Sequence, residues 1–391
     1  MARGSSSSRR STTSEFSSLP GTAGDAIRKD RSGLMRGARN CVNGYCAIQP
    51  EERVLLWLDR TEKVDSKVVE ALARAIDETG APLSILQTKA PIFRYGERLS
   101  KVEEAAISNA NVLMHVFDLE NAASVDNADI YRCMWENELR VTSVIAITPQ
   151  VMTSDWAHYP PELHYYMWIK SARLLHATEA RLTDDLGTDL RMRLFPWPEG
   201  DPFSSSWASV DKKAKVHRPA GTWEFFPGGT IAICPREVEG TLVFEFLEGF
   251  AGYLSEPIRL TVRDHWVTKV EGGEEAKWLS ERMRCYTNGS YFCEFAWGIN
   301  PRTPLQEALR VKAPDSLLFR RAGSFHCAVG LWPGMGVPSP FHWDGGGLKA
   351  TLTLNEKTVI DRGYLTMLDD RDVRELASKY GNPDDFLSYE S

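Results

Sequence analysis

The sequence lacks several features that would place it in common protein classes. None of its hydrophobic runs approaches the roughly 18 apolar residues that define a membrane-spanning helix, so we expect no membrane partner. It has no excess of positive charge either, because 46 Lys and Arg stand against 53 Asp and Glu, a net charge of −7. Nucleic acid is therefore not expected as a partner, since phosphate binding requires a basic surface.

Cysteine is also scarce, with 7 residues in 391 and no Cys-x-x-Cys pair. This odd, low count argues against a disulfide framework and against a zinc finger, and it favours a reducing compartment. We therefore expect a cytoplasmic protein. The hydrophobic share of 42% and the charged share of 25% are ordinary for a globular chain that can bury a large core.

The chain divides into a tail and two domains. Residues 1–33 are rich in Ser, Arg and Thr and poor in apolar residues, so they cannot offset the entropy lost on ordering and are predicted to be a disordered tail. Whether this tail is a targeting segment stays open. Residues 34–198 alternate between strand and helix patterns, whereas residues 199–391 contain mainly short strand patterns interrupted by Gly and Pro.

The first domain is predicted to be a Rossmann-like α/β domain. Short apolar runs separated by helical patterns indicate a parallel sheet that is buried on both faces. The strands are expected at 53–59, 83–86, 111–117 and 141–148, and helices at 66–79, 127–139 and 161–175. No Gly-x-Gly-x-x-Gly follows the first strand, so dinucleotide binding is poorly supported. His115 lies near the end of a strand, where such sheets bind ligands, and has either a structural or a functional role.

The second domain is predicted to be α+β and rich in strands, and three of its apolar segments contain ionisable residues. His342 and Asp344 are two residues apart in FHWDGGG, so on a strand their side chains share a face and suit a divalent cation. Glu294 in YFCEFAW and His326 in GSFHCAVG are likewise surrounded by apolar residues, where an unpaired charge is costly. Together these four residues predict a metal site, and the alternative is a structural salt-bridge cluster.

Aromatic residues flank these four candidates. Trp297 and Trp343 could belong to the core or could line a flat apolar pocket for a substrate.

Around these residues the sequence resembles a known superfamily. Its two branches are the thermophilic metallo-aminopeptidases of the aminopeptidase T type and the 2,5-dihydroxypyridine 5,6-dioxygenases. The resemblance covers residues 36–365 and rests on GTWEFFPGGTIAICPREVEGTLVFE (221–245), VTKVEGGEEAKWLSERM (267–283), EFAWGINP (294–301) and the His-Trp-Asp at 342–344. It implies a Rossmann-like N-terminal half, a mixed, β-rich C-terminal half and a homo-oligomer.

The resemblance also implies roles for individual residues. His342 and Asp344 match a metal-ligand pair of both branches. Glu294 matches a ligand Glu of the aminopeptidases, where the dioxygenases have a His, and His326 matches another ligand His of the aminopeptidases, where the dioxygenases have an apolar residue. Thr230 stands where the aminopeptidases carry a further ligand Glu, which puts a complete two-metal site in doubt.

Two residues of the first half resemble positions of the dioxygenase branch. His115 matches a His that handles substrate protons, and Arg191 stands where that branch has a second pocket His. Arg191 is therefore a candidate substrate-binding residue.

Three functions remain open from the sequence. The first is an aminopeptidase-like hydrolase that acts on a peptide, an amide or a related small molecule with Zn²⁺ or Co²⁺. Glu294, His342 and Asp344 would hold the metal, His326 would bind a second ion or donate a hydrogen bond to the oxyanion, and His115 would be the general acid or base.

The second function is a mononuclear non-haem dioxygenase that opens a ring, in which His326, His342 and one carboxylate hold Fe(II). The third is a degenerate, non-catalytic binding protein, which the threonine at position 230 would fit.

Overall fold

A computed structural model describes most of the chain. The described residues are 33–59, 64–88, 99–117, 132–133, 136–145, 147–194, 209–210, 216–217, 222–310, 317–330, 339 and 341–389. The predicted tail, apart from its last residue, and most of the helix predicted at 127–139 lie outside these ranges.

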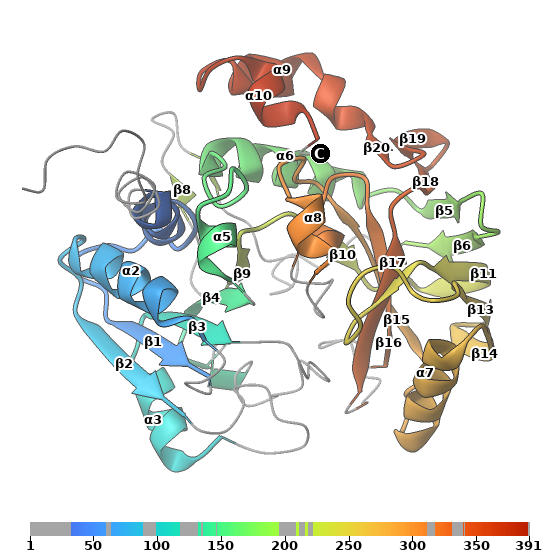
Figure 1. The fold of residues 1–391 in the computed structure, drawn as a ribbon, viewed down its shortest axis with the longest axis horizontal. Coiled ribbons are helices and arrows are strands. Elements are labelled where there is room, and N and C mark those ends of the chain that lie inside the picture. The colour runs from blue at the N-terminus through green and yellow to red at the C-terminus, as the bar shows by residue number, and fades with distance from the viewer. Residues whose placement is uncertain are drawn as a thin grey trace, which may run out of the picture.

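A five-stranded parallel sheet forms the first unit, as predicted (Figure 1). Its order is β2-β1-β3-β4-β9, with the strands β1 (Val54–Leu58), β2 (Leu83–Gln87), β3 (Val112–Phe117), β4 (Arg140–Ile145) and β9 (Trp223–Phe226). Every residue of β1 and β3 is buried, so both faces of the sheet are covered. Helix α2 (Ser66–Asp77) shares an apolar core with one face, and α3 (Lys101–Ser108) shares another with the opposite face.

Two antiparallel sheets form the second unit. The inner sheet has the order β10-β15-β16-β17-β12, with β10 (Thr230–Ile233), β12 (Phe246–Leu247), β15 (Phe292–Gly298), β16 (Phe325–Gly330) and β17 (His342–Gly347). The outer sheet has the order β14-β13-β11-β6-β5-β18-β19-β20, with β5 (Glu179–Thr183), β6 (Asp189–Arg193), β11 (Glu237–Phe244), β13 (Ile258–Arg263), β14 (Trp266–Glu271), β18 (Thr351–Leu354), β19 (Lys357–Asp361) and β20 (Tyr364–Leu365). Apolar side chains from both sheets form one core, so the two sheets pack face to face.

The remaining elements surround these sheets. They are η1 (Asn40–Tyr45), α5 (Pro149–Met152), α6 (Pro161–Leu174), β7 (Ser209–Val210), β8 (Val216–His217), α7 (Glu274–Cys285), α8 (Leu305–Ala308), η3 (Leu318–Arg320), η4 (Thr366–Asp369), α9 (Arg371–Ala377) and α10 (Pro383–Leu387). Helix α6 contacts both η1 and α9, so it joins the two units.

The two units exchange segments across residue 198, where the sequence suggested a domain boundary. Strands β5 and β6 precede that residue, yet they lie in the middle of the outer sheet between β11 and β18. Strand β9 follows it, yet it extends the parallel sheet beside β4. Each unit therefore contains chain from both sides of the suggested boundary.

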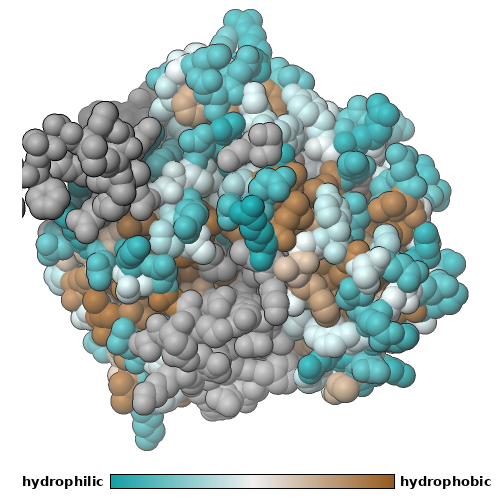
Figure 2. Space-filling view, in the orientation of Figure 1, coloured by the Kyte–Doolittle hydropathy of each residue, from teal (hydrophilic) through white to brown (hydrophobic). Residues whose placement is uncertain are grey.

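The visible surface is largely hydrophilic, with hydrophobic residues in small groups among polar ones (Figure 2). Within the described ranges, no helix combines the length and the apolar character needed to cross a membrane.

Candidate metal centre

The inner sheet has two faces of opposite character. Along β15, Phe295 and Trp297 point into the core shared with the outer sheet, and Cys327, Val329 and Trp343 of the next two strands do the same. Because successive side chains of a strand point to opposite faces, the residues between them point away from that core. The four ionisable candidates all lie on this second face.

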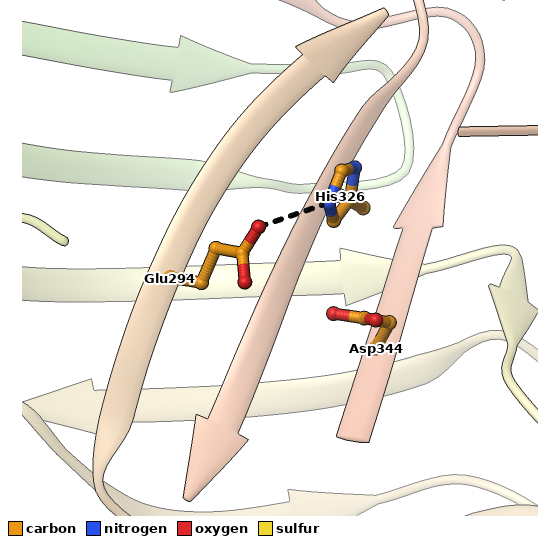
Figure 3. Close-up of side chains that lie close together, drawn as sticks. All are labelled: Glu294, His326 and Asp344. Carbon is orange, nitrogen blue, oxygen red and sulfur yellow. Dashed lines mark hydrogen bonds and ion pairs between the residues drawn. The ribbon is translucent and has the colours of Figure 1, made fainter. Parts of the chain in front are cut away.

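Strand register aligns two carboxylates on this face. Glu294 lies opposite Ala328 in the β15–β16 pair, and Ala328 lies opposite Asp344 in the β16–β17 pair. His326 is two residues before Ala328, and His342 is two residues before Asp344, so both imidazoles share the face with the carboxylates. Figure 3 shows Glu294, His326 and Asp344 extending from three adjacent strands.

The four side chains converge closely. His326 Nε2 lies 3.2 Å from Glu294 Oε1, and His342 Nε2 lies 3.4 Å from Glu294 Oε2 and also 3.4 Å from Asp344 Oδ1. One potential ligand atom from each of Glu294, His326 and Asp344 lies within 4.8 Å of the others. The structure thus brings together residues from three separate stretches of sequence, as the metal-site prediction required.

The cluster is buried at the junction of the two units. The exposed fractions of Glu294, His326, His342 and Asp344 are 7%, 2%, 8% and 4%, so bulk water scarcely reaches them. The ring of Phe319, which belongs to the core of the parallel unit, stacks on His326 with 4.9 Å between ring centres. These contacts place the cluster on a face of the inner sheet that meets the core of the parallel unit at Phe319.

Electrostatic coupling links His342 and Asp344. Burial lowers the pKa of His342, but the charge of Asp344 outweighs this effect and raises it well above its usual value. Burial raises the pKa of Asp344, but His342, His326 and a hydrogen bond with Glu248 together lower it. The raised pKa of His342 and the lowered pKa of Asp344 indicate that the two side chains form an ion pair. A bound cation would take the place of the proton on the His342 imidazolium.

Cys293 orients His342 rather than serving as a nucleophile. Its Sγ lies 3.7 Å from His342 Nδ1, on the ring side away from the cluster. Burial raises the pKa of the Cys293 thiol to about 11, so the thiol stays protonated at neutral pH.

Glu248 is a site residue that the sequence reasoning missed. It follows β12, is 4% exposed, and its backbone N–H donates to the carbonyl oxygen of Asp344 at 2.9 Å. Its sequence signal was weak, because it is one acidic residue among several in FEFLEGF.

Thr230 lies on the same face at the edge of the sheet. It pairs with Gly298, four residues beyond Glu294 along β15. Its buried hydroxyl has no hydrogen-bond partner in the described part of the chain.

The predicted substrate-binding residues lie elsewhere. Trp297 and Trp343 point into the core between the two antiparallel sheets, on the opposite face of the inner sheet from the cluster. The indole N–H of Trp343 donates to the carbonyl oxygen of Glu248 at 2.9 Å, which is a structural contact. Arg191 is exposed on β6, between the buried Leu190 and Met192, so it lies on the far face of the outer sheet. The structure does not bring these three residues to the cluster.

His115 is fully buried within the parallel sheet. Its Nε2 lies 2.5 Å from Ser143 Oγ, and its ring lies beside Phe117 and Trp223. Burial lowers the pKa of His115 to about 3, so the imidazole is neutral at physiological pH. His115 belongs to β3, and the carboxyl end of that strand is directed toward the second unit (Figure 1).

Together, the fold and the cluster define a two-part protein: a Rossmann-like unit joined to a β-sandwich that carries a candidate metal centre on its inner sheet. The chain belongs to the 2,5-dihydroxypyridine 5,6-dioxygenase (NicX) family, whose sequence model matches residues 40–367. This confirms the superfamily inferred from the sequence motifs, and the family is one of enzymes.

Individual relatives agree with this assignment. A 2,5-dihydroxypyridine 5,6-dioxygenase from Pseudomonas putida is 27% identical over 141 residues, which span 34% of this chain and 36% of that enzyme. The solved structure of 2,5-dihydroxypyridine dioxygenase from P. putida KT2440 superposes with a TM-score of 0.69 at 17% identity, covering 88% of this chain and 99% of that one. AmpT from Thermus thermophilus gives a TM-score of 0.56 at 16% identity, covering 86% and 99%. The two structural likenesses concern the fold.

Proposed function

We propose that this protein is a metal-dependent hydrolase that cleaves a peptide, an amide or a related small molecule through activated water. The observation that carries the proposal is the buried convergence of two carboxylates and two imidazoles, Glu294, Asp344, His326 and His342, on one sheet face. Buried carboxylates without a compensating cation are costly.

The residues present fit a divalent cation. Asp344 Oδ1 is buried and faces His342 Nε2 at 3.4 Å, a position in which both atoms could bind one cation. Ala328, between the two carboxylates, contributes only a methyl group to the floor of the site. Mixed nitrogen and oxygen donors suit Zn²⁺, Co²⁺ or Fe²⁺ better than Ca²⁺ or Mg²⁺, which prefer oxygen alone. When bound, such a cation acts as a Lewis acid and acidifies water.

The chain's own residues hold and shield the reacting groups. Glu294 and Asp344 supply negative charge, and His342 is held in place by Cys293 on its other ring nitrogen. The Phe319 ring fixes the plane of His326, which could then donate a hydrogen bond to an oxygen that gains charge. An acid–base role for His115 remains a prediction, and its neutral, buried imidazole would require the substrate to reach the carboxyl end of β3.

Metal reconstitution tests this function. The protein is stripped with a chelator and reloaded separately with Zn²⁺, Co²⁺ and Fe²⁺, and each form is assayed for amide and peptide cleavage. We expect Zn²⁺ or Co²⁺ to restore cleavage, and E294Q and D344N to abolish it. Cleavage that is equally fast in the stripped protein would rule out the metal-dependent mechanism.

A second candidate is a ring-cleaving Fe(II) dioxygenase acting on a small dihydroxylated aromatic ring. Membership of the dioxygenase family over residues 40–367 favours it. His326, His342 and one carboxylate provide the two-histidine, one-carboxylate donor set of many such enzymes. Consumption of O₂ by the Fe²⁺-loaded protein with a dihydroxypyridine, and no amide cleavage with any metal, would select this function over hydrolysis.

We also infer a homo-oligomer in a reducing compartment. None of the seven cysteines forms a disulfide in the described chain, and six of them are buried, which suits a protein that is kept reduced. Self-association rests on family resemblance, and light scattering coupled to gel filtration would test it.

A further inference from the structure

Glu248 occupies a defined place beside the cluster. Phe246 and Leu247 of β12 pair with Gly346 and Gly345 of β17, so the next residue, Glu248, comes level with Asp344. The backbone hydrogen bond from Glu248 to Asp344 confirms this register. Residues directly opposite each other in an antiparallel pair point to the same face, with Cβ atoms roughly 5 Å apart.

The sheet therefore carries three carboxylates in one row. Glu294, Ala328, Asp344 and Glu248 follow one another across β15, β16, β17 and the end of β12. Glu248 is 4% exposed, and a side-chain hydrogen bond with it is among the effects that lower the pKa of Asp344.

The backbone on both sides fixes Glu248 in this position. The indole of Trp343 donates to the Glu248 carbonyl, and the chain turns immediately afterwards at Gly249, whose φ is +85°. A side chain at position 249 would also meet the Trp343 ring at 3.1 Å. Glu248 is therefore held beside Asp344 by contacts that do not involve its own carboxylate.

The charges of this row are poorly balanced without a cation. The ion pairs that Glu294 and Asp344 form within the described chain are all with His326 and His342. Two adjacent buried carboxyl groups, Asp344 and Glu248, repel each other unless a proton or a cation lies between them. A cation bound beside Asp344 would take the place of the proton that the two carboxyl groups otherwise have to share.

We propose that Glu248 is a further metal-binding residue, which supplies a third carboxylate to the cation held by Glu294, Asp344 and the two histidines. This inference rests on the proposed metal centre and extends its ligand set to the edge of the inner sheet at β12.

Calorimetric titration of the chelator-stripped protein with Mn²⁺ or Zn²⁺ tests the proposal. We expect E248Q to weaken binding by roughly tenfold or more, whereas E248D, which keeps the charge, should recover much of the loss. E103Q is the matched control: Glu103 is also a buried glutamate, at 6% exposure, but it caps α3 in the parallel unit. The metal affinity of E103Q should equal that of the wild type.

The outcomes separate the two proposals. The glutamine of E248Q can still hydrogen-bond to Asp344, so a purely orienting role for Glu248 would leave the affinity unchanged and overturn the inference. If E248Q fails to fold, E248D decides: its shortened carboxylate should still cost a measurable part of the metal affinity, and an affinity equal to that of the wild type would overturn the inference. A wild-type protein that binds neither ion would instead overturn the proposed metal centre.

Discussion

Ala328 lies directly opposite Asp344 in the β16–β17 pair, and its neighbour on the other side is Glu294. A single methyl group therefore separates the two carboxylates within the row. Any larger side chain at this position would occupy the space in which their oxygen atoms converge.

The A328V variant tests the importance of this gap. Valine suits a strand, so the sheet should form, but its added methyl groups would fill the site floor. We expect metal affinity to fall by roughly tenfold or more, an effect of the size seen when groups around a metal site are disturbed. A180V, which enlarges a buried alanine of β5 in the outer sheet, should leave affinity unchanged. Equal affinities in A328V and the wild type would show that the cation does not bind there.

The E294Q variant should lose stabilisation by metal. A ligand at a hundred times its dissociation constant stabilises a protein by about 2.7 kcal/mol, and we expect the wild type to gain such stability from Zn²⁺ in thermal unfolding. In chelator, E294Q should be as stable as the wild type or more so, because it buries one charge fewer. A metal-induced shift of equal size in both proteins would contradict this.

Two buried histidines should make stability depend on pH. Burial lowers the pKa of His115 to about 3 and that of His164 to about 4, below the usual value of 6.5. As the pH falls, the two histidines therefore become protonated in the unfolded chain before they do so in the folded chain. The free energy of unfolding should decrease as the pH drops from about 6.5 toward 4. Each histidine contributes a slope of about 1.4 kcal/mol per pH unit in that window.

Urea unfolding of H164Q between pH 7 and pH 4.5 measures this effect. His164 is 1% exposed and its Nε2 has no hydrogen-bond partner in the described chain. In H164Q the slope of the unfolding free energy against pH should be smaller than in the wild type by the contribution of one histidine, about 1.4 kcal/mol per pH unit. An unchanged slope would mean that His164 is accessible to protons in the folded state.

Trp297, first considered as a substrate contact, should affect stability alone. It lies in the core between the antiparallel sheets. We expect W297F to cost about 1–3 kcal/mol of unfolding free energy, as other core shape changes do, with metal affinity within about twofold of the wild type. A large loss of affinity in the absence of unfolding would place this indole at the site after all.

Much of the fold follows from local patterns in the sequence. The run Val54–Leu58 predicts a strand buried on both faces, and all five of its residues are buried. Alternation along a strand also correctly predicts that His342 and Asp344 share a face. The same rule, applied to Trp343 between them and to Arg191 between Leu190 and Met192, already indicates that these two side chains point elsewhere.

The remaining features depend on contacts between distant segments. Nothing near Glu248 indicates that the short strand before it pairs with β17, because that pairing is set by the packing of the whole inner sheet. The pairing of β9 with β4 cannot be predicted from the sequence pattern either, since a strand of four residues has little periodicity of its own. Sequence patterns therefore identify the four members of the cluster but not Glu248, the third carboxyl-bearing residue of the row.

The exchange of β5, β6 and β9 between the two units has a practical consequence for expressing fragments. A protein cut at residue 198 would leave the outer sheet without two interior strands and would strip the parallel sheet of one edge. Neither piece would retain a closed hydrophobic core, so we expect both to aggregate when produced separately. Heating the intact chain should instead give one unfolding transition, because each unit depends on strands from the other side of residue 198 and the two units unfold together.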